Sequence, residues 1–243
     1  ASRQLLHDQR WTSVLDLDTT TPILKKIFGP QGYDVMGAGG DVCLPGAIEY
    51  QSLHVDFKED YQVSQARIAH AEGVGIKPRW LDDRTLDPRS QQMILVRTPP
   101  VITINFFMSD LTWENGPIRQ IPGSHAMPFA PPSQEDEPAW MRLSTLVGAA
   151  AGAGVFRDSR AWHGATPNIS RQVRAMPNVE YGASWLDDSW YEQTMPDEIY
   201  QGLSQHARTI CRRVKADPGV WPPGAGIMHP HAHARQKAKE NTG

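Results

Sequence analysis

The sequence predicts a mainly β protein in which two sheets pack face to face with a few flanking helices. Several short segments alternate between apolar and polar residues, and only two segments have helical spacing. Glycine and proline each account for 20 of the 243 residues, which indicates many turns between short elements. Short strands without a repeating strand–helix–strand pattern favour a double-sheet β architecture over a parallel α/β fold.

The clearest predicted strand covers residues 101–108, VITINFFM. Its isoleucines alternate with Thr103 and Asn105, so one face should pack on the core and the other should line a more polar cavity. Further strands are predicted over residues 91–97, from 154 onward and over 178–185. Residues 113–125 combine Asn-Gly-Pro and Pro-Gly turns around a short apolar stretch, as a hairpin or tight loop does.

Two helices and one exposed loop complete the predicted elements. Residues 60–72 are rich in helix formers and end before Gly73, and residues 197–215 carry a loose apolar stripe. Asp197 at the start of the second segment and basic residues at its end suit the helix dipole. Residues 129–140, FAPPSQEDEPAW, are predicted to be an exposed loop.

Length and composition indicate one domain over residues 1–243, with a core at about 42–216 and a Pro/Gly-rich C-terminal tail. A net charge of −3 gives no basic surface for nucleic acid, and no apolar run approaches the ~20 residues that span a membrane. The two cysteines, Cys43 and Cys211, make no disulfide framework. We therefore expect an intracellular, cytoplasmic protein.

The stretch QSLHVDF at residues 51–57 places an imidazole and a carboxylate two residues apart among apolar neighbours. In a strand, side chains two residues apart project from the same face, so His54 and Asp56 should point together. Such a pair suits either a metal or a buried hydrogen bond, and a third partner decides between them.

Two histidines remain as third partners, His125 and His163. His125 closes the turn of IPGSH, where hydrogen bonding to the backbone is the favoured interpretation. The HPHAH tract at 229–233 resembles a metal-binding tract, but it lies in the Pro/Gly-rich tail without a predicted element to hold it. His163 stands late in a predicted strand, and Arg174 follows it by 11 residues, beyond a turn.

Two histidines and one carboxylate on separate strands form the facial triad that suits non-haem Fe(II), because open coordination positions remain for a cosubstrate and dioxygen. An arginine close to such a metal can hold the far end of an anionic ligand in a bidentate contact. His54, Asp56, His163 and Arg174 are therefore the candidate site.

The chain resembles the phytanoyl-CoA dioxygenase family of Fe(II)/2-oxoglutarate oxygenases. Four segments carry the resemblance in the family's order: QSLHVDF, TWENGPIRQIPGSH, FRDSRAWHGATPNISRQVR and MPDEIYQGL. The resemblance implies a double-stranded β-helix, or jelly roll. It also implies that His54, Asp56 and His163 ligate iron, that Arg174 pairs with the distal carboxylate of 2-oxoglutarate, and that Gln51 contacts this cosubstrate.

Two positions depart from the family pattern. Ala165 stands where relatives often carry a serine that contributes to cosubstrate binding, and Ile118 stands where some carry a threonine. Either change removes a hydroxyl from the expected cosubstrate site.

The resemblance implies a dioxygenase that uses Fe(II), 2-oxoglutarate and O2, hydroxylates a small-molecule substrate and releases succinate and CO2. Two alternatives stay open. The same His-Asp-His set could bind zinc and activate water for hydrolysis, which gives Arg174 no required role. The chain could also be a jelly-roll binding module without activity, for which Ala165 and Ile118 are the indications.

Overall fold

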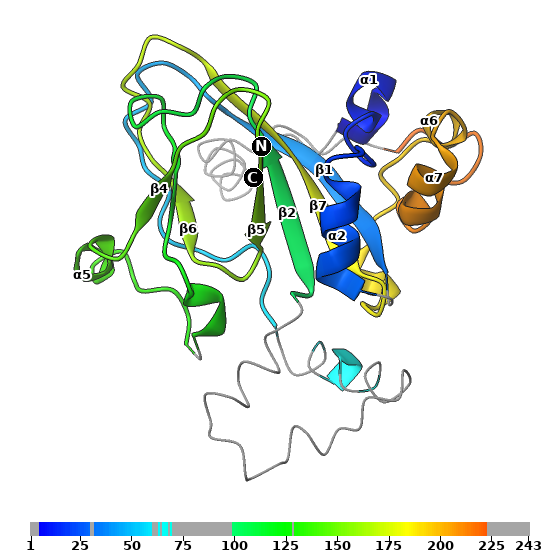
Figure 1. Ribbon diagram of the computed structural model, residues 1–243, viewed down its shortest axis with the longest axis horizontal. Coiled ribbons are helices and arrows are strands. Elements are labelled where there is room, and N and C mark those ends of the chain that lie inside the picture. Colours follow the sequence, from blue (N-terminus) through cyan, green and yellow to red (C-terminus); the bar gives the residue numbers. More distant parts are fainter. Residues whose placement is uncertain are drawn as a thin grey trace, which may run out of the picture.

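A computed structural model describes residues 5–29, 32–59, 63, 65–67, 69, 99–127 and 129–222. Two antiparallel sheets form its centre (Figure 1). The four-stranded sheet has the order β1 (Tyr33–Cys43), β7 (Arg174–Ala183), β2 (Val101–Phe106), β5 (Gly154–Asp158). The three-stranded sheet has the order β4 (Thr145–Val147), β3 (Ile118–Gln120), β6 (His163–Ala165). The predicted fold class, a mainly β double-sheet protein with flanking helices, is confirmed.

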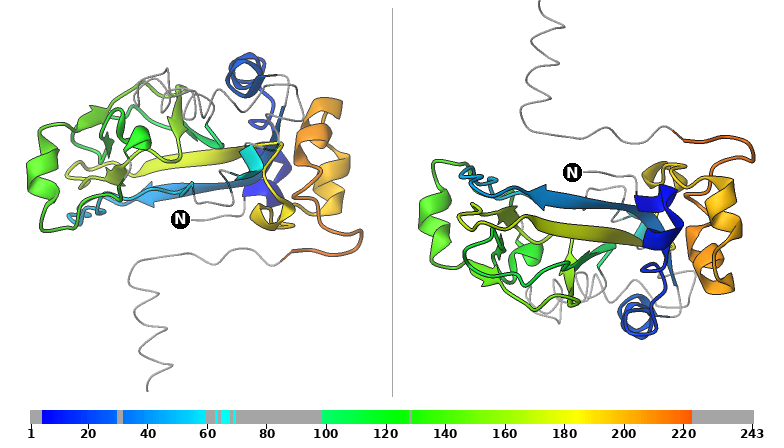
Figure 2. Two further views of the ribbon diagram at one scale, coloured as in Figure 1. Left: turned by 90° about the horizontal axis from the view of Figure 1, so that it is seen from below. Right: turned by 90° about the horizontal axis from the view of Figure 1, so that it is seen from above.

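Short helices flank the sheets on different sides. They are η1 (Leu5–His7), α1 (Gln9–Thr12), α2 (Thr21–Phe28), η4 (Ser124–Ala126), α5 (Glu137–Met141), η5 (Asp188–Trp190), α6 (Asp197–Gln201) and α7 (Gln205–Cys211). Figure 2 shows α6 and α7 at one end of the long strands β1 and β7, and α5 at the opposite end. The end that carries α5 also carries the small sheet.

One face of the four-stranded sheet is apolar and packs against the helices. The largest core cluster joins Ile104, Val179 and Tyr181 of the sheet to Leu24 and Phe28 of α2. The Tyr181 hydroxyl donates to the carbonyl of Leu15 at 2.9 Å, which ties the N-terminal segment to the sheet. The packed core therefore begins well before residue 42.

The opposite face looks toward the three-stranded sheet. Met176 of β7 and Phe107, just beyond β2, pack against Ile118 of β3 in a separate apolar cluster. Thr103 and Asn105 are buried on this face, at 1% and 2% exposure. The predicted alternation in β2, with a packed side and a more polar side, is confirmed.

The predicted strands at 101–108, 154 onward and 178–185 correspond to β2, β5 and β7. His163, however, does not continue the strand that begins at 154. The chain turns after Asp158, where the N–H of Ala161 bonds to the Asp158 carbonyl at 2.9 Å, and His163 opens β6 in the other sheet. This turn carries the histidine from one sheet to the facing one.

The helix predicted over 197–215 is two short helices, and the single-helix prediction is wrong. Gly202 caps α6, and the Ser204 hydroxyl accepts a hydrogen bond from the Ala207 N–H at 2.9 Å, which starts α7 in a new direction. The apolar residues on both pieces still reach the core. A serine that follows a glycine this closely is the local signal for the break.

Other expectations fall on residues outside those described. These are the strand over 91–97, the HPHAH tract at 229–233 and most of the helix over 60–72. The described positions of that helix, 63, 65–67 and 69, are helical. Within the part of the chain that the structure describes, no helix is both long and apolar enough to cross a membrane.

Candidate metal centre

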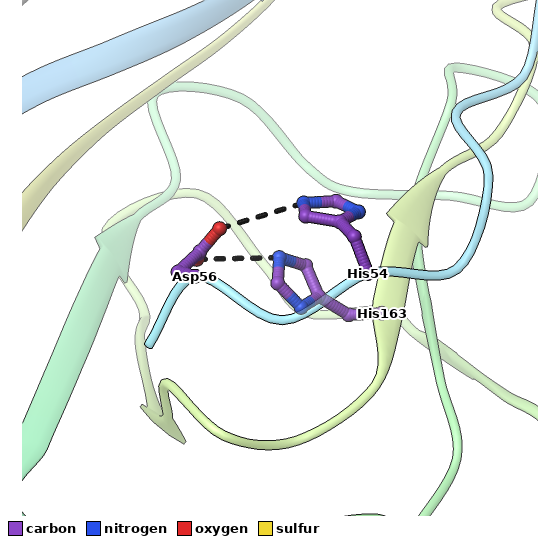
Figure 3. Close-up of side chains that lie close together, drawn as sticks. All are labelled: His54, Asp56 and His163. Carbon is purple, nitrogen blue, oxygen red and sulfur yellow. Dashed lines mark ion pairs between the residues drawn. The ribbon is translucent and has the colours of Figure 1, made fainter. Parts of the chain in front are cut away.

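The structure brings His54, Asp56 and His163 together, although more than 100 residues separate the first two from the third. One ligand atom from each side chain lies within 4.8 Å of the others. Each imidazole points its Nε2 at a different oxygen of Asp56: His54 at 3.4 Å from Oδ1 and His163 at 3.3 Å from Oδ2 (Figure 3). Three potential ligand atoms thus converge on one point.

A β-bridge places the two histidines beside each other. The His54 N–H donates to the His163 carbonyl at 3.0 Å, and the His163 N–H donates back to the His54 carbonyl at 3.1 Å. Residues 51–57, all of them described, contain this bridge rather than the regular strand expected. The expectation that His54 and Asp56 project together is nevertheless fulfilled, because both face His163.

Backbone carbonyls fix the orientation of both rings. The Nδ1 of His54 lies 2.9 Å from the Ser52 carbonyl, and the Nδ1 of His163 lies 2.9 Å from the Ala161 carbonyl. A carbonyl can only accept, so each contact is a hydrogen bond when Nδ1 carries the proton and Nε2 has a free lone pair. Metal-bound histidines commonly have this arrangement, in which the ring nitrogen away from the metal donates to a carbonyl and so fixes the ring.

Arg157 of β5 is a fourth member of the site. Its Nη2 donates to Asp56 Oδ2 at 2.7 Å, and its Nη1 lies 3.1 Å from His163 Nδ1. A guanidinium can only donate, so it favours an unprotonated Nδ1, whereas the Ala161 carbonyl favours a protonated one. The two contacts therefore select opposite tautomers of His163.

The surroundings shift the pKa values of the three titratable groups for different reasons. Burial alone would raise the pKa of Asp56, but hydrogen bonds from His163 and His54 and the charge of Arg157 outweigh it, so this pKa is well below its usual range. Burial lowers the pKa of His163 and prevails over its hydrogen bond to Asp56. At His54 burial also acts to lower the pKa, but the bonds to Asp56 and Ser52 prevail and raise it.

Solvent can reach the centre from one side. The side chains of His54 and Asp56 are each 32% exposed, whereas that of His163 is 8% exposed. An ion can therefore enter past His54 and Asp56, while His163 lies at the back of the site.

Arg174 lies on the same face of the four-stranded sheet as Arg157. Thr103 pairs with both Arg157 of β5 and Glu180 of β7, and Arg174 lies six residues from Glu180 along β7, an even number that keeps it on that face. Arg174 is 4% exposed, and its buried Nε and Nη1 have no hydrogen-bond partner among the described residues. A buried cation with unused donors is costly, and an anionic ligand would supply the missing bonds.

Gln51 is hydrogen-bonded to β6 beside the candidate metal site. Its side-chain carbonyl accepts a hydrogen bond from the Ala165 N–H at 3.3 Å, and its own N–H donates to the Ala165 carbonyl at 3.0 Å. Gln51 thus pairs with β6 as a strand residue would, one step from the bridge between His54 and His163.

A buried ion pair, which the sequence interpretation missed, holds the segment before His54. Arg119 donates to both Glu137 and the Gln51 carbonyl, each at 2.8 Å, and Glu137 also accepts from the Leu53 N–H. Glu137 is 2% exposed, so the prediction of an exposed loop over 129–140 is wrong at this residue. An arginine inside the apolar stretch PIRQI was the only signal in the sequence.

The two departures from the family pattern face each other. Ile118 of β3 pairs with Ala165 of β6, and Ile118 packs in the apolar cluster between the sheets. The small side chain of Ala165 lies opposite the large side chain of Ile118, and neither carries a hydroxyl group. His125 lies in η4 rather than in the His-Asp-His group, and Trp162 packs with Leu53 and Ile121 in an apolar cluster.

A model of the phytanoyl-CoA dioxygenase (PhyH) family matches residues 15–176 of the chain. The chain belongs to this family. The match includes β1, β2, β5, β6 and the start of β7, and with them every candidate site residue. Members of the family use Fe(II), 2-oxoglutarate and O2.

Solved structures show the same fold. The crystal structure of EvdMO1 matches with a TM-score of 0.50 and 16% identity, over 74% of this chain and 34% of that one. The apo form of ThoJ, described as a non-heme monooxygenase, matches with a TM-score of 0.50 and 13% identity, over 75% of this chain and 58% of that one. The chain thus spans about a third of the first protein and just over half of the second. No curated protein matches the sequence.

The residues present fit the cofactors of the family. Two imidazole Nε2 atoms and one ionised carboxylate form a donor set suited to Fe(II). The buried, partly unbonded guanidinium of Arg174 suits the far carboxylate of 2-oxoglutarate.

Proposed function

We propose that the protein is a dioxygenase that depends on Fe(II) and 2-oxoglutarate and hydroxylates a small-molecule substrate. The observation that carries the proposal is the combination of a converging His-Asp-His group with a buried, partly unbonded arginine, Arg174, on the sheet face that also carries Arg157, which contacts Asp56. A zinc hydrolase needs the first feature but not the second.

Each residue has a defined part in this proposal. His54, Asp56 and His163 hold the metal through two Nε2 atoms and a carboxylate oxygen, and the Ser52 and Ala161 carbonyls favour the tautomer of each ring that leaves Nε2 free. Arg174 holds the distal carboxylate of 2-oxoglutarate in a bidentate contact. Gln51 positions β6 next to the cosubstrate.

Bound Fe(II), with 2-oxoglutarate and O2, supplies the oxidising chemistry: the cosubstrate is converted to succinate and CO2, and one oxygen atom enters a C–H bond of the substrate. The protein's part is to orient the ligands, exclude water on the buried His163 side and neutralise the cosubstrate. Asp56 supports hydroxylation over halogenation, because related halogenases have a small residue here that leaves room for chloride.

The test is an anaerobic titration of the metal-depleted protein with Fe(II) and then 2-oxoglutarate, followed by visible absorption. A 2-oxoglutarate bound through two atoms to Fe(II) gives a weak charge-transfer band. We expect this band in the wild type and its loss in His54→Ala. Arg174→Gln should need at least about 30-fold more 2-oxoglutarate to give the band. Breaking a buried charge pair typically costs at least ~2 kcal/mol.

Arg171→Gln is the matched control, because Arg171 is exposed just before β7 and should leave the titration unchanged. Tight metal binding without the band would support the zinc hydrolase, and the absence of metal binding would support the inactive module. Either result contradicts the proposal.

A further inference from the structure

Arg157 places a full positive charge against the candidate metal ligands. Its guanidinium donates to Asp56 at 2.7 Å and lies 3.1 Å from the His163 ring, and the side chain is 5% exposed. Little solvent screens a charge at this depth, so it acts strongly on any ion held by the same ligands. The buried Nε of Arg157 has no hydrogen-bond partner among the described residues.

Two consequences of this contact oppose a bare dication. The guanidinium repels a second cation at short range, and it already uses part of the negative charge of Asp56. Its contact with His163 Nδ1 also favours the tautomer that carries a proton on Nε2, the atom that would ligate the metal.

The same charge favours an anion on the metal. A dication and Arg157 together leave the centre more positive than the metal and Asp56 alone. A negatively charged ligand that enters beside the metal is attracted to both cations. The Arg157 charge thus weakens the binding of the metal alone. It strengthens the binding of the metal together with an anion.

We propose that Arg157 is a positioning residue that tunes the His54–Asp56–His163 centre to bind a divalent metal together with an anionic ligand rather than the metal alone. The inference rests on the proposed function for the identity of that anion, 2-oxoglutarate, but its metal-binding part stands on the geometry of Arg157.

The experiment measures two affinities in the metal-depleted protein with Co(II), whose visible absorption reports its ligands. The first is the affinity for Co(II) alone, and the second is the affinity of the Co(II)-loaded protein for 2-oxoglutarate. Arg157→Gln should bind Co(II) at least tenfold more tightly and 2-oxoglutarate at least tenfold more weakly. Arg157→Lys, which keeps the charge but not the two-pronged contact, should lie closer to the wild type than Arg157→Gln in both affinities.

Arg160→Gln is the matched control. Arg160 is also buried, but it pairs with Asp158 at 2.7 Å and Glu59 at 2.6 Å rather than with Asp56. Its loss should change thermal stability while leaving both affinities within about threefold. If Arg157→Gln does not fold, Arg157→Met serves as the second neutral variant.

Unchanged or weaker Co(II) binding by a folded neutral variant would overturn the inference, and so would equal effects of Arg157→Lys and Arg157→Gln. A wild type that binds Co(II) but not 2-oxoglutarate contradicts the proposed function alone, since tighter Co(II) binding by Arg157→Gln still supports the role of Arg157. A wild type that does not bind Co(II) overturns both.

Discussion

The two candidate histidine ligands have opposite environments although the sequence presents two similar side chains. His163 is buried behind the site, and burial lowers its pKa. His54 is partly exposed, and burial acts to lower its pKa too, but its bonds to Asp56 and the Ser52 carbonyl outweigh this and raise it. A neutral imidazole is required for ligation, so only His54 competes with protons near neutral pH.

The affinity for the metal should therefore fall as the pH is lowered, with one proton taken up for each metal ion released. Below the raised pKa of His54, which lies above its ordinary value of about 6.5, each pH unit should lower the affinity for Co(II) about tenfold. His163 and Asp56 take up protons only at lower pH, because both of their pKa values are lowered, so His54 alone sets the slope near neutral pH. Co(II) titrations at several pH values measure the slope. A hundredfold loss per unit would show that both histidines titrate and would contradict the assignment.

At the scale of elements, the centre depends on the close approach of β6 to the segment before His54. A Cβ on Gly164 would lie 2.4 Å from the Gln51 carbonyl oxygen and 3.3 Å from Arg119 Nε. A backbone atom cannot move away without shifting the whole segment, so this position requires glycine. The buried Arg119–Glu137 pair holds the same segment through hydrogen bonds to the Gln51 carbonyl and the Leu53 N–H.

Gly164→Ala should separate this segment from β6. We expect a loss of about 1–3 kcal/mol in the free energy of unfolding, as for other overpacked sites, and a metal affinity at least tenfold weaker. Denaturant unfolding and Co(II) titration measure the two effects. Gly154→Ala is the control, because a Cβ there meets only side-chain atoms, the nearest at 3.4 Å. Full metal affinity in Gly164→Ala would show that the close approach is not needed.

At the scale of the molecule, the metal would join segments that lie far apart in the chain. His54 and Asp56 belong to the segment after β1, and His163 opens β6 of the second sheet. The three ligands cannot converge in an unfolded chain, so a metal that binds them favours the folded state.

Metal should therefore raise the melting temperature. At a free metal concentration 100 times the Kd, linkage gives about 2.7 kcal/mol, which corresponds to roughly 5–10 °C for a chain of this size. Thermal unfolding with Co(II) and with a chelator measures the shift. His54→Ala should lose most of it, and an equal shift in that variant would place the stabilising ion elsewhere.

The sequence alone determined the features that depend on local pattern. Alternation predicted β2 and its polar face, because side-chain direction in a strand has a period of two. The HxD spacing and the later His163 and Arg174 indicated the metal centre, and their order supported the family. Each of these signals depends on residues that lie a few positions apart or that follow a fixed order along the chain.

The tertiary structure decided which distant groups share one site. Nothing local in the sequence shows that Arg157 contacts Asp56 or that Glu137 is buried against Arg119, because those partners are 101 and 18 residues apart in the chain. The glycine-rich strand β1 and the break between α6 and α7 were missed for the related reason that packing and caps overrode weak local preference. Spacing predicts which side chains point together, whereas the charge environment of a site arises only when separate segments of the chain pack against one another.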